Sequence, residues 1–346
     1  AALAGRAPGR PLAMADAPET MPIGLTLNLH THLEGWVRPA TASELAAELG
    51  VPAPPGGWET AMRVAQPGDL PAYLAHVAVV YPLLRSASAL ERVTAEAVVD
   101  AAADGCRFLE LRVGPVTHAS AETPLEAVME ALCRGLRRGT DETGIGAGLV
   151  AAALRHHTPA DNERLARLAV RHRADGVVGF DIAGDELTYP DLRAHAGAFE
   201  IAREGGLGIT AHAAEAGPAS AAREAHDLLG ARRIGHGTRL ATDDEALAWA
   251  ADTGICIEVC PTSNRLTGAT AKGVPHPLRR FLATGCAVVL GDDNPRQTGS
   301  PLSAEAASLI TREGLARAEL EQMSQSAISN VFCDEATRRR LRDGIG

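Results

Sequence analysis

Residues 25–35 read LTLNLHTHLEG, a short apolar run that ends in two histidines and an acid. From here onward the chain alternates such runs with amphipathic segments, the pattern expected of repeated β-α units around a parallel sheet. The runs that we assign to strands cover residues 25–30, 107–113, 147–154, 177–182, 207–212, 233–236, 255–260 and 287–291. About eight strands close a (β/α)8 barrel. The sequence therefore predicts an α/β fold of the TIM-barrel type.

Helices are expected between these strands, at residues 124–143, 159–173, 190–204 and 242–251. Residues 41–104 are too many for one connection, so we expect extra helices there that cap the barrel mouth, and a further helical tail at 301–346. No change of composition divides residues 23–346, which favours one domain. Residues 1–22 lack the compact apolar core and cleavage site of a signal peptide. We expect them to be a disordered extension or a remnant of an expression vector.

Composition limits the partners that this chain can have. Its 346 residues carry 33 Lys and Arg against 43 Asp and Glu, a net charge of −10. An acidic balance argues against nucleic acid or anionic lipid as a partner and favours a small molecule. No apolar stretch reaches the roughly 20 residues that span a bilayer. The six cysteines form no Cys-x-x-Cys pair, which is typical of free thiols in a reducing compartment. We expect a cytoplasmic protein.

Side chains that suit a metal site follow four of the predicted strands. His30 and His32 end the first strand, and alternate strand residues point to the same face, so both can converge on one ion. The corresponding residues of the other three strands are His212 and Glu215, His236, and the pair Asp292 and Asp293. Each motif alone has an ordinary explanation, such as a satisfied core histidine or a capping acid. Together they lie where barrel enzymes assemble their sites. Imidazoles and carboxylates without a thiolate suit Zn²⁺.

These motifs resemble the adenosine/adenine deaminase family of the metal-dependent amidohydrolase superfamily. They occur in the family's order from Leu25 to about Asp334: His30-Thr-His32-Leu-Glu-Gly35, Asp181-Ile-Ala-Gly184-Asp-Glu186, His212-Ala-Ala-Glu215, Gly235-His236-Gly237, Glu258-Val-Cys-Pro-Thr-Ser-Asn264 and Asp293-Asn-Pro295. The resemblance implies a zinc-dependent deaminase barrel over residues 23–346. It further implies zinc ligation by His30, His32, His212 and Asp293, proton transfer by Glu215 and His236, and substrate contacts by Glu34, Gly184 and Asn294.

Three positions depart from the family's usual pattern. Ala214 replaces a common glycine, and its methyl group should be tolerated unless the backbone angle φ is positive there. Asp293 aligns best with the metal ligand because the following proline then also aligns, with Asp292 as the alternative ligand. Glu34 stands where enzymes acting on adenosine often have Asp, so it resembles adenine or aminodeoxyfutalosine deaminases more closely.

The chemistry of deamination assigns roles to two of these residues. Replacing the C6 amino group of a 6-aminopurine needs a nucleophile, a proton on N1 and a proton for the departing ammonia. Zn²⁺ lowers the pKa of a bound water to about 7. Glu215 is the candidate to deliver the N1 proton, and His236 is left as the base for the water or as the group that orients it.

The predicted function is therefore hydrolytic deamination of a 6-aminopurine nucleoside, adenosine or a modified adenosine. Free-base adenine deamination is one alternative, and a mononuclear zinc amidohydrolase with another substrate is a second. Many amidohydrolases bridge two metals with a carbamylated lysine on the fourth strand. The sole lysine here is Lys272, well away from that strand, which favours one zinc per chain. A barrel kept only for binding is disfavoured because the ligand set and both proton-transfer residues are present.

Overall fold

The predicted apolar runs form a ring of parallel strands. The computed structural model describes residues 21–344, so most of the expected N-terminal extension lies outside the described residues. Neighbouring strands follow one another in chain order. Their bounds are β1 (Leu27–His32), β2 (Phe108–Val113), β3 (Gly146–Leu154), β4 (Val177–Ala183), β5 (Gly208–Ala213), β6 (Arg233–His236), β7 (Cys256–Val259) and β8 (Ala287–Leu290). This confirms the (β/α)8 barrel.

The ring closes at the carboxyl ends of β1 and β8. The amide N of Asp293 donates to the His30 carbonyl oxygen at 2.9 Å, and the amide N of His32 donates to the Asp293 carbonyl oxygen at 2.7 Å. Thr31 and Asp293 accordingly form a parallel bridge. The closure thus brings three predicted site residues together through the backbone alone.

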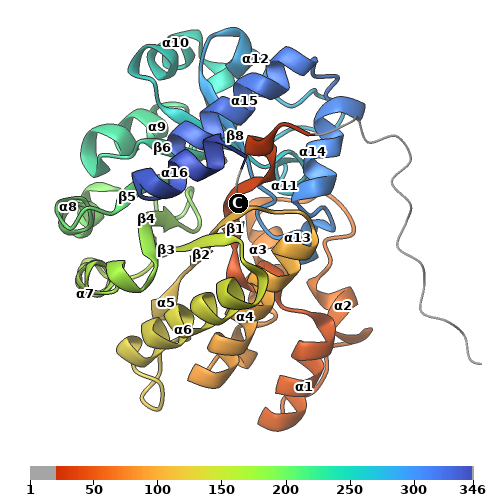
Figure 1. The fold of residues 1–346 in the computed structure, drawn as a ribbon, viewed down its shortest axis with the longest axis vertical. Helices are drawn as coiled ribbons and strands as arrows, with labels where there is room; N and C mark the ends of the chain where they lie inside the picture. Colours follow the sequence, from red (N-terminus) through yellow and green to blue (C-terminus); the bar gives the residue numbers. More distant parts are fainter. Residues whose placement is uncertain (1–20, 345–346) are drawn as a thin grey trace, which may run out of the picture.

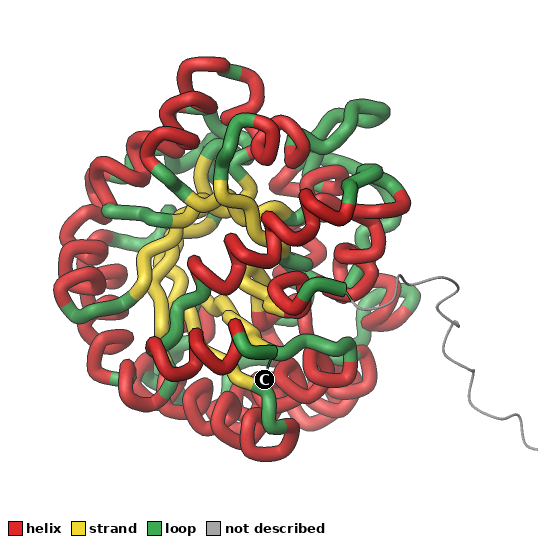
Figure 2. Tube along the Cα trace, turned by 45° about the horizontal axis from the view of Figure 1, so that its top comes forward, coloured by secondary structure: helices red, strands yellow, loops and turns green. Residues whose placement is uncertain are grey.

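Helices surround the strands as an outer layer (Figure 2). Those between successive strands are α6 (Leu125–Thr143), α7 (Pro159–Arg171), α8 (Ala196–Glu204), α10 (Asp244–Thr253) and α12 (Leu278–Ala283). The helix expected from residue 190 begins six residues later, because the Asp191 carboxylate accepts the Arg193 amide and forms a turn first. The start of α10 is set by Asp243, whose carboxylate accepts the amides of Glu245 and Ala246.

Extra helices form in both regions where they were predicted, after β1 and in the tail. The long connection after β1 forms α1 (Pro39–Leu49), α2 (Gly57–Met62), α3 (Leu70–Ala78) and α4 (Ala87–Ala103). The tail forms α14 (Leu302–Thr311), α15 (Arg317–Asn330) and α16 (Glu335–Arg342). In Figure 1, α15 and α16 cross in front of the strands. Ile328 and Leu341 of these helices pack on Leu27 and Phe108 at the first residues of β1 and β2. They therefore cover the amino ends of the strands and leave the carboxyl ends for the site.

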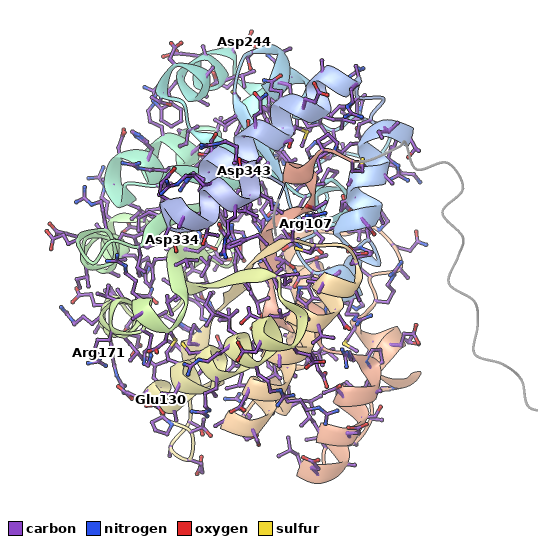
Figure 3. All side chains as sticks on the ribbon, in the orientation of Figure 1. Arg107, Glu130, Arg171, Asp244, Asp334 and Asp343 are labelled. Carbon is purple, nitrogen blue, oxygen red and sulfur yellow. The ribbon has the colours of Figure 1, made fainter. Side chains whose placement is uncertain are left out.

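Charged side chains cover the outside of the molecule. Those labelled in Figure 3, among them Glu130, Arg171 and Asp244, are all exposed. Within residues 21–344, no helix has both the length and the apolar character needed to cross a membrane.

Candidate active site

A network of buried ion pairs fills the barrel beneath the strand ends. Arg112, Arg233, Asp181, Glu110 and Glu258 have fully buried side chains. Nη1 of Arg112 lies 3.1 Å from Asp181 Oδ2, and Nε of Arg233 lies 2.7 Å from Glu258 Oε1. Arg112 also pairs with Glu258, and Arg233 with Glu110. Each arginine faces two carboxylates, so the two positive charges offset two of the three negative charges inside the network.

The four predicted metal ligands meet above this network. Nε2 of His32 lies 3.2 Å from His212 Nε2 and 3.4 Å from Asp293 Oδ1. Nε2 of His30 lies 3.8 Å from the same Asp293 oxygen. Burial lowers the pKa of His32 to about 4 and holds that of His30 well below its usual value. Both imidazoles are therefore neutral, the form that binds metal.

These distances and the unsatisfied atoms fit a zinc ion. A zinc ion with Zn–N bonds of about 2.0 Å can hold ligand atoms that lie up to about 4 Å apart, and all three distances above are below that limit. Nε2 of His30 is buried and has no hydrogen-bond partner among the described residues. Nε2 of His32 and Nε2 of His212 face each other at 3.2 Å, so both can direct a lone pair at one cation. The nearest groups thus have the chemistry of a zinc site.

Carboxylates and hydroxyls hold three of these ligands from behind. Glu258 Oε2 lies 2.8 Å from His30 Nδ1, and Asp181 Oδ2 lies 2.9 Å from His212 Nδ1. Burial opposes a proton on His212, but the Asp181 carboxylate more than offsets this and raises its pKa. Asp293 accepts hydrogen bonds from three side chains: Tyr73 at 3.1 Å, Ser263 at 2.5 Å and Asn294 at 2.8 Å. Such groups orient a ligand and tune the metal.

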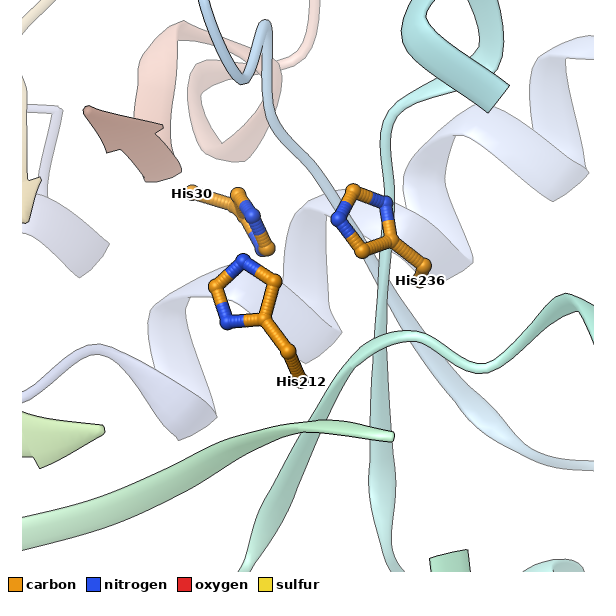
Figure 4. Close-up of side chains that lie close together, drawn as sticks. All are labelled: His30, His212 and His236. Atoms are coloured by element: carbon orange, nitrogen blue, oxygen red, sulfur yellow. The ribbon is translucent and has the colours of Figure 1, made fainter. Parts of the chain in front are cut away.

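His236 lies as close to the centre as the predicted ligands. Its ring centroid is 4.7 Å from that of His30 and 5.2 Å from that of His212. Figure 4 shows the three rings converging from separate parts of the chain. Their nitrogens lie within 4.8 Å of one another, as do the ligand atoms of His30, His32 and Asp293. The two groups share His30, so distances alone do not separate His236 from the ligands.

Asp292, the alternative ligand, belongs to neither group. Its side chain is 1% exposed, and both carboxylate oxygens are buried without a hydrogen-bond partner among the described residues. Burial raises the pKa of Asp292 to about 8. The structure therefore places Asp293, and not Asp292, beside the histidines.

Strained backbone occurs at three site positions. The described residues other than glycine that have positive φ are Ala214 at 55°, His236 at 66° and Asp293 at 60°. We expected Ala214 to be tolerated only if its φ were negative, and its φ is positive. Its left-handed conformation costs about 1–2 kcal/mol. Strain of this kind is concentrated at functional sites, where the surroundings hold it in place.

Glu186 holds the strained segment that contains Ala214 and Glu215. Its buried carboxylate accepts the amide N–H groups of four successive residues, at 2.6 Å from Ala214 and at 3.1, 3.0 and 2.9 Å from the next three. A Cβ on Gly217 would lie 2.8 Å from the Glu186 carboxyl carbon, so this close approach requires glycine. Each hydrogen bond to a charged group contributes about 1.5–3 kcal/mol, so the set outweighs the strain at Ala214.

Glu215 projects from that segment toward His236. The shortest distance between them is 3.7 Å, from Glu215 Oε2 to His236 Nε2. The Thr267 hydroxyl donates to Glu215 Oε1 at 3.1 Å. Burial raises the pKa of Glu215 above its usual value. A buried carboxyl group with a raised pKa is suited to donate a proton in a reaction.

A cavity of about 270 Å³ opens from these residues toward α3. The predicted substrate contacts Glu34, Gly184 and Asn294 all line it, and α3 contributes Leu70 and Leu74. None of the described residues that line it is Lys or Arg. Its walls are thus mainly apolar, with polar groups at a few positions, as is usual for a small-molecule site.

A buried pair defines one part of the cavity wall. Oε1 of Glu34 lies 2.8 Å from Nε2 of His118, which is on α5 (Pro115–His118). The two residues are 5% and 0% exposed. Burial opposes ionisation of Glu34, but the hydrogen bond with His118 outweighs it and lowers the Glu34 pKa. Glu34 thus presents a fixed carboxylate.

Comparison with known proteins decides the family. A family model described as adenosine deaminase matches residues 26–346. The chain belongs to the adenosine deaminase family. An adenosine deaminase from Mycolicibacterium vanbaalenii is 35% identical over 338 residues, which cover 92% of each chain. As a member of this metal-dependent family, the chain is a hydrolytic deaminase.

Three solved structures share the fold at 25% identity. Adenine deaminase from Arthrobacter aurescens has a TM-score of 0.84 over 94% of this chain and 98% of its own. A zinc-bound amidohydrolase from Burkholderia ambifaria has a TM-score of 0.83 over 96% and 94%. The N6-methyl-AMP deaminase of Arabidopsis thaliana has a TM-score of 0.80 over 92% and 96%. Similar barrels in this family thus act on different purines.

Sequence reasoning missed three residues that support the site. His118 pairs with Glu34, Thr267 donates to Glu215, and Nε2 of His276 lies 3.0 Å from the Asn264 amide oxygen. All three are on connections after strand ends, where polar residues are common and carry no distinctive spacing. The position of His118 three residues after Pro115 at a strand end was the one available signal.

Proposed function

We propose that this enzyme hydrolytically deaminates a 6-aminopurine nucleoside, adenosine or a modified adenosine, to the 6-oxo product and ammonia. The observation that carries the proposal is the position of Glu215. Its buried carboxyl group, with a raised pKa, lines one cavity with His32, His212 and Asp293, three of the four clustered residues. An acid beside a metal-type cluster is the combination that amidine hydrolysis requires.

In this proposal His30, His32, His212 and Asp293 would hold one zinc ion. When bound, zinc lowers the pKa of a coordinated water to about 7, which makes a nucleophile available at neutral pH. Asp181 and Glu258 keep His212 and His30 oriented for that role.

The remaining steps belong to this chain's own residues. The water oxygen attacks C6 and forms the new C–O bond, while Glu215 protonates N1. The hydroxyl proton then moves to the amino group as the C6–N bond breaks, so that ammonia leaves and the 6-oxo purine remains. His236 faces the same space as Glu215 and is the group left to act on the water.

The purine would be held by Gly184 and Asn294. Gly184 has a φ of 107° that favours glycine, so its backbone can approach a ring closely. The Asn294 amide nitrogen donates one hydrogen to Asp293, which leaves its second hydrogen for a ring nitrogen. Sites built on such contacts reject analogues that lack the partner by about 10⁴-fold.

The cavity favours an uncharged substrate over a nucleotide. A phosphate group would find no Lys or Arg among the described lining residues and would lie in a cavity with the Glu34 carboxylate. Free adenine is the second candidate, because the chain is similar to an adenine deaminase and carries Glu at position 34. A third is another substrate of a mononuclear zinc amidohydrolase.

The test is a substrate screen with zinc-loaded protein. Loss of the adenine chromophore would be followed with adenine, adenosine, 5′-deoxyadenosine, aminodeoxyfutalosine, AMP and N6-methyl-AMP. We expect a nucleoside to have the highest kcat/KM. Turnover of adenine alone would replace the nucleoside by the free base, and preference for AMP would contradict the argument from the cavity. No turnover of any 6-aminopurine would overturn the proposal.

A further inference from the structure

The three histidines at the centre have different groups behind them. Nδ1 of His30 faces a Glu258 oxygen at 2.8 Å, and Nδ1 of His212 faces an Asp181 oxygen at 2.9 Å. An ionised carboxylate only accepts hydrogen bonds, so Nδ1 of His30, which is hydrogen-bonded to Glu258, carries the proton. The negative charge of Asp181 favours a proton on the adjacent Nδ1 of His212. Nε2 of both rings is then left with its lone pair toward the centre, as a metal ligand requires.

His236 has an amide behind it instead of an acid. Nδ1 of His236 lies 2.9 Å from the side-chain amide of Asn264. An amide group can present either its oxygen or its nitrogen, and the choice decides where the imidazole proton lies. The orientation of the Asn264 amide is determined by its second hydrogen-bond partner, His276.

His276 has only one possible arrangement of its proton. Its Nδ1 accepts the backbone N–H of Leu278 at 3.2 Å, so Nδ1 carries no hydrogen. Burial lowers the pKa of His276 to about 3, so the ring is neutral and its single proton is on Nε2. Nε2 lies 3.0 Å from Asn264 Oδ1 and donates to it.

The orientation of Asn264 then fixes the tautomer of His236. Because Oδ1 of Asn264 accepts from His276, Nδ2 of Asn264 must point at His236 and donate to its Nδ1. Neutral His236 consequently carries its proton on Nε2, the nitrogen that lies 3.7 Å from Glu215 Oε2.

We propose that His276 is a positioning residue which, acting through Asn264, presents His236 to the attacking water as an N–H donor and not as a base or a metal ligand. The proposal rests on the deaminase function above and deepens it. His236 then holds the water oxygen and stabilises its developing negative charge. Glu215 takes one water proton and passes it to N1 as the C6–O bond forms. The remaining proton of the attached hydroxyl moves to the amino group as the C6–N bond breaks, and ammonia leaves.

Nuclear magnetic resonance of zinc-loaded protein labelled with ¹⁵N-histidine tests the tautomers directly. We expect a proton on Nε2 of His236, and on Nδ1 of His30 and His212. A neutral His236 protonated on Nδ1 would overturn the proposal. This readout does not depend on turnover, so it separates the tautomer from the choice of substrate.

Substitution of Asn264 by Asp should place the His236 proton on the other ring nitrogen. Asn264→Asp puts a carboxylate behind His236, as in His30 and His212, and should move the proton to Nδ1. The loss of one donor to a developing charge should lower kcat by about 10²-fold or more, with zinc content unchanged. An unchanged kcat with a proton on Nδ1 would show that the donor is not needed and would contradict the proposal.

His276 itself is tested by two variants. His276→Gln can still accept from Leu278 and donate to Asn264, so kcat should stay within about threefold of the parent. His276→Leu removes the donor, frees the Asn264 amide to turn, and should lower kcat by about tenfold or more with little change in KM. His226→Leu is the matched control, because His226 is exposed and pairs with Asp227 at the surface. Equal kcat for the Gln and Leu variants would contradict the positioning role of His276. If the Leu variant fails to fold, the nuclear magnetic resonance spectra of the parent protein still test the His236 tautomer.

Discussion

The ligand half of the site and its proton-transfer half are built on opposite kinds of support. His30 and His212 lie against carboxylates, Glu258 and Asp181, that belong to the buried ion network below. His236 and Glu215 lie against neutral groups, the amide of Asn264 and the hydroxyl of Thr267. Acids behind an imidazole expose a lone pair, whereas donors behind it expose a proton.

This difference shows how one cluster of similar side chains performs two kinds of chemistry. Distances alone place His236 with His30 and His212. In our proposal, the groups behind the rings separate two metal ligands from one hydrogen-bond donor. The backbone does not share this contrast, because positive φ occurs in both halves, at Ala214 and His236 and also at Asp293.

The largest effect should come from breaking the ligand half. His212→Ala removes a nitrogen that faces His32 at 3.2 Å. We expect the variant to lose zinc, measured by elemental analysis, and about 10⁴-fold or more of its kcat/KM, because the nucleophile is no longer available at neutral pH. Chelation of the parent protein should reproduce this loss, and added zinc should reverse it. Full turnover of metal-free protein would contradict the zinc assignment.

The next largest effect should come from the proton-transfer half. Glu215→Gln preserves size but cannot deliver a proton, so we expect a loss of about 10³-fold in kcat. Zinc content should equal that of the parent, in contrast to His212→Ala. Glu204→Gln is the control, because Glu204 is an exposed residue at the end of α8. Near-parental activity of Glu215→Gln would contradict this role for Glu215 and would assign the proton donor to Asp185 or Glu186.

A smaller effect should follow from replacing the carboxylate that lies behind His212. Asp181→Asn replaces the acid behind His212 by an amide, the reverse of Asn264→Asp. We expect zinc affinity to fall by about 10–100-fold, because the amide no longer fixes the ligand tautomer. Asp227→Asn is matched to it, since Asp227 also lies 2.9 Å from a histidine Nδ1 but at the surface. Zinc titration of both variants measures the difference, and equal affinities would contradict the comparison.

The sequence predicted the fold and the cluster well because both depend on local pattern. Apolar runs with polar residues at their carboxyl ends identify barrel strands, and His30, His32 and Asp293 then converge through ring closure. Individual helix starts were displaced where a side chain such as Asp191 formed a turn first.

The supports of the site could not be predicted in the same way. Glu34 and His118 are 84 residues apart, and no spacing rule connects them. The strain at Ala214 depends on a backbone angle that the Glu186 carboxylate holds from a different loop. Tautomers depend on chains of hydrogen bonds, which require coordinates. The sequence therefore predicted which residues lie together at the site, while the structure was needed for how they are held.

The smallest effect should come from the cavity wall. His118→Phe keeps an aromatic ring of similar size but removes the partner that fixes the Glu34 carboxylate. The test assumes that Glu34 accepts a hydrogen bond from a hydroxyl of the substrate. Loss of one such oriented hydrogen bond costs about 1.4 kcal/mol, which should raise KM for adenosine about tenfold. The kcat should stay within about threefold of the parent value. Adenine, which has no substituent on N9, should keep its KM. His172→Phe is the control, because His172 pairs with Asp175 near the surface. A larger KM for both substrates would mean that His118 shapes the purine pocket itself, and a loss of kcat alone would place Glu34 with the proton-transfer half of the site.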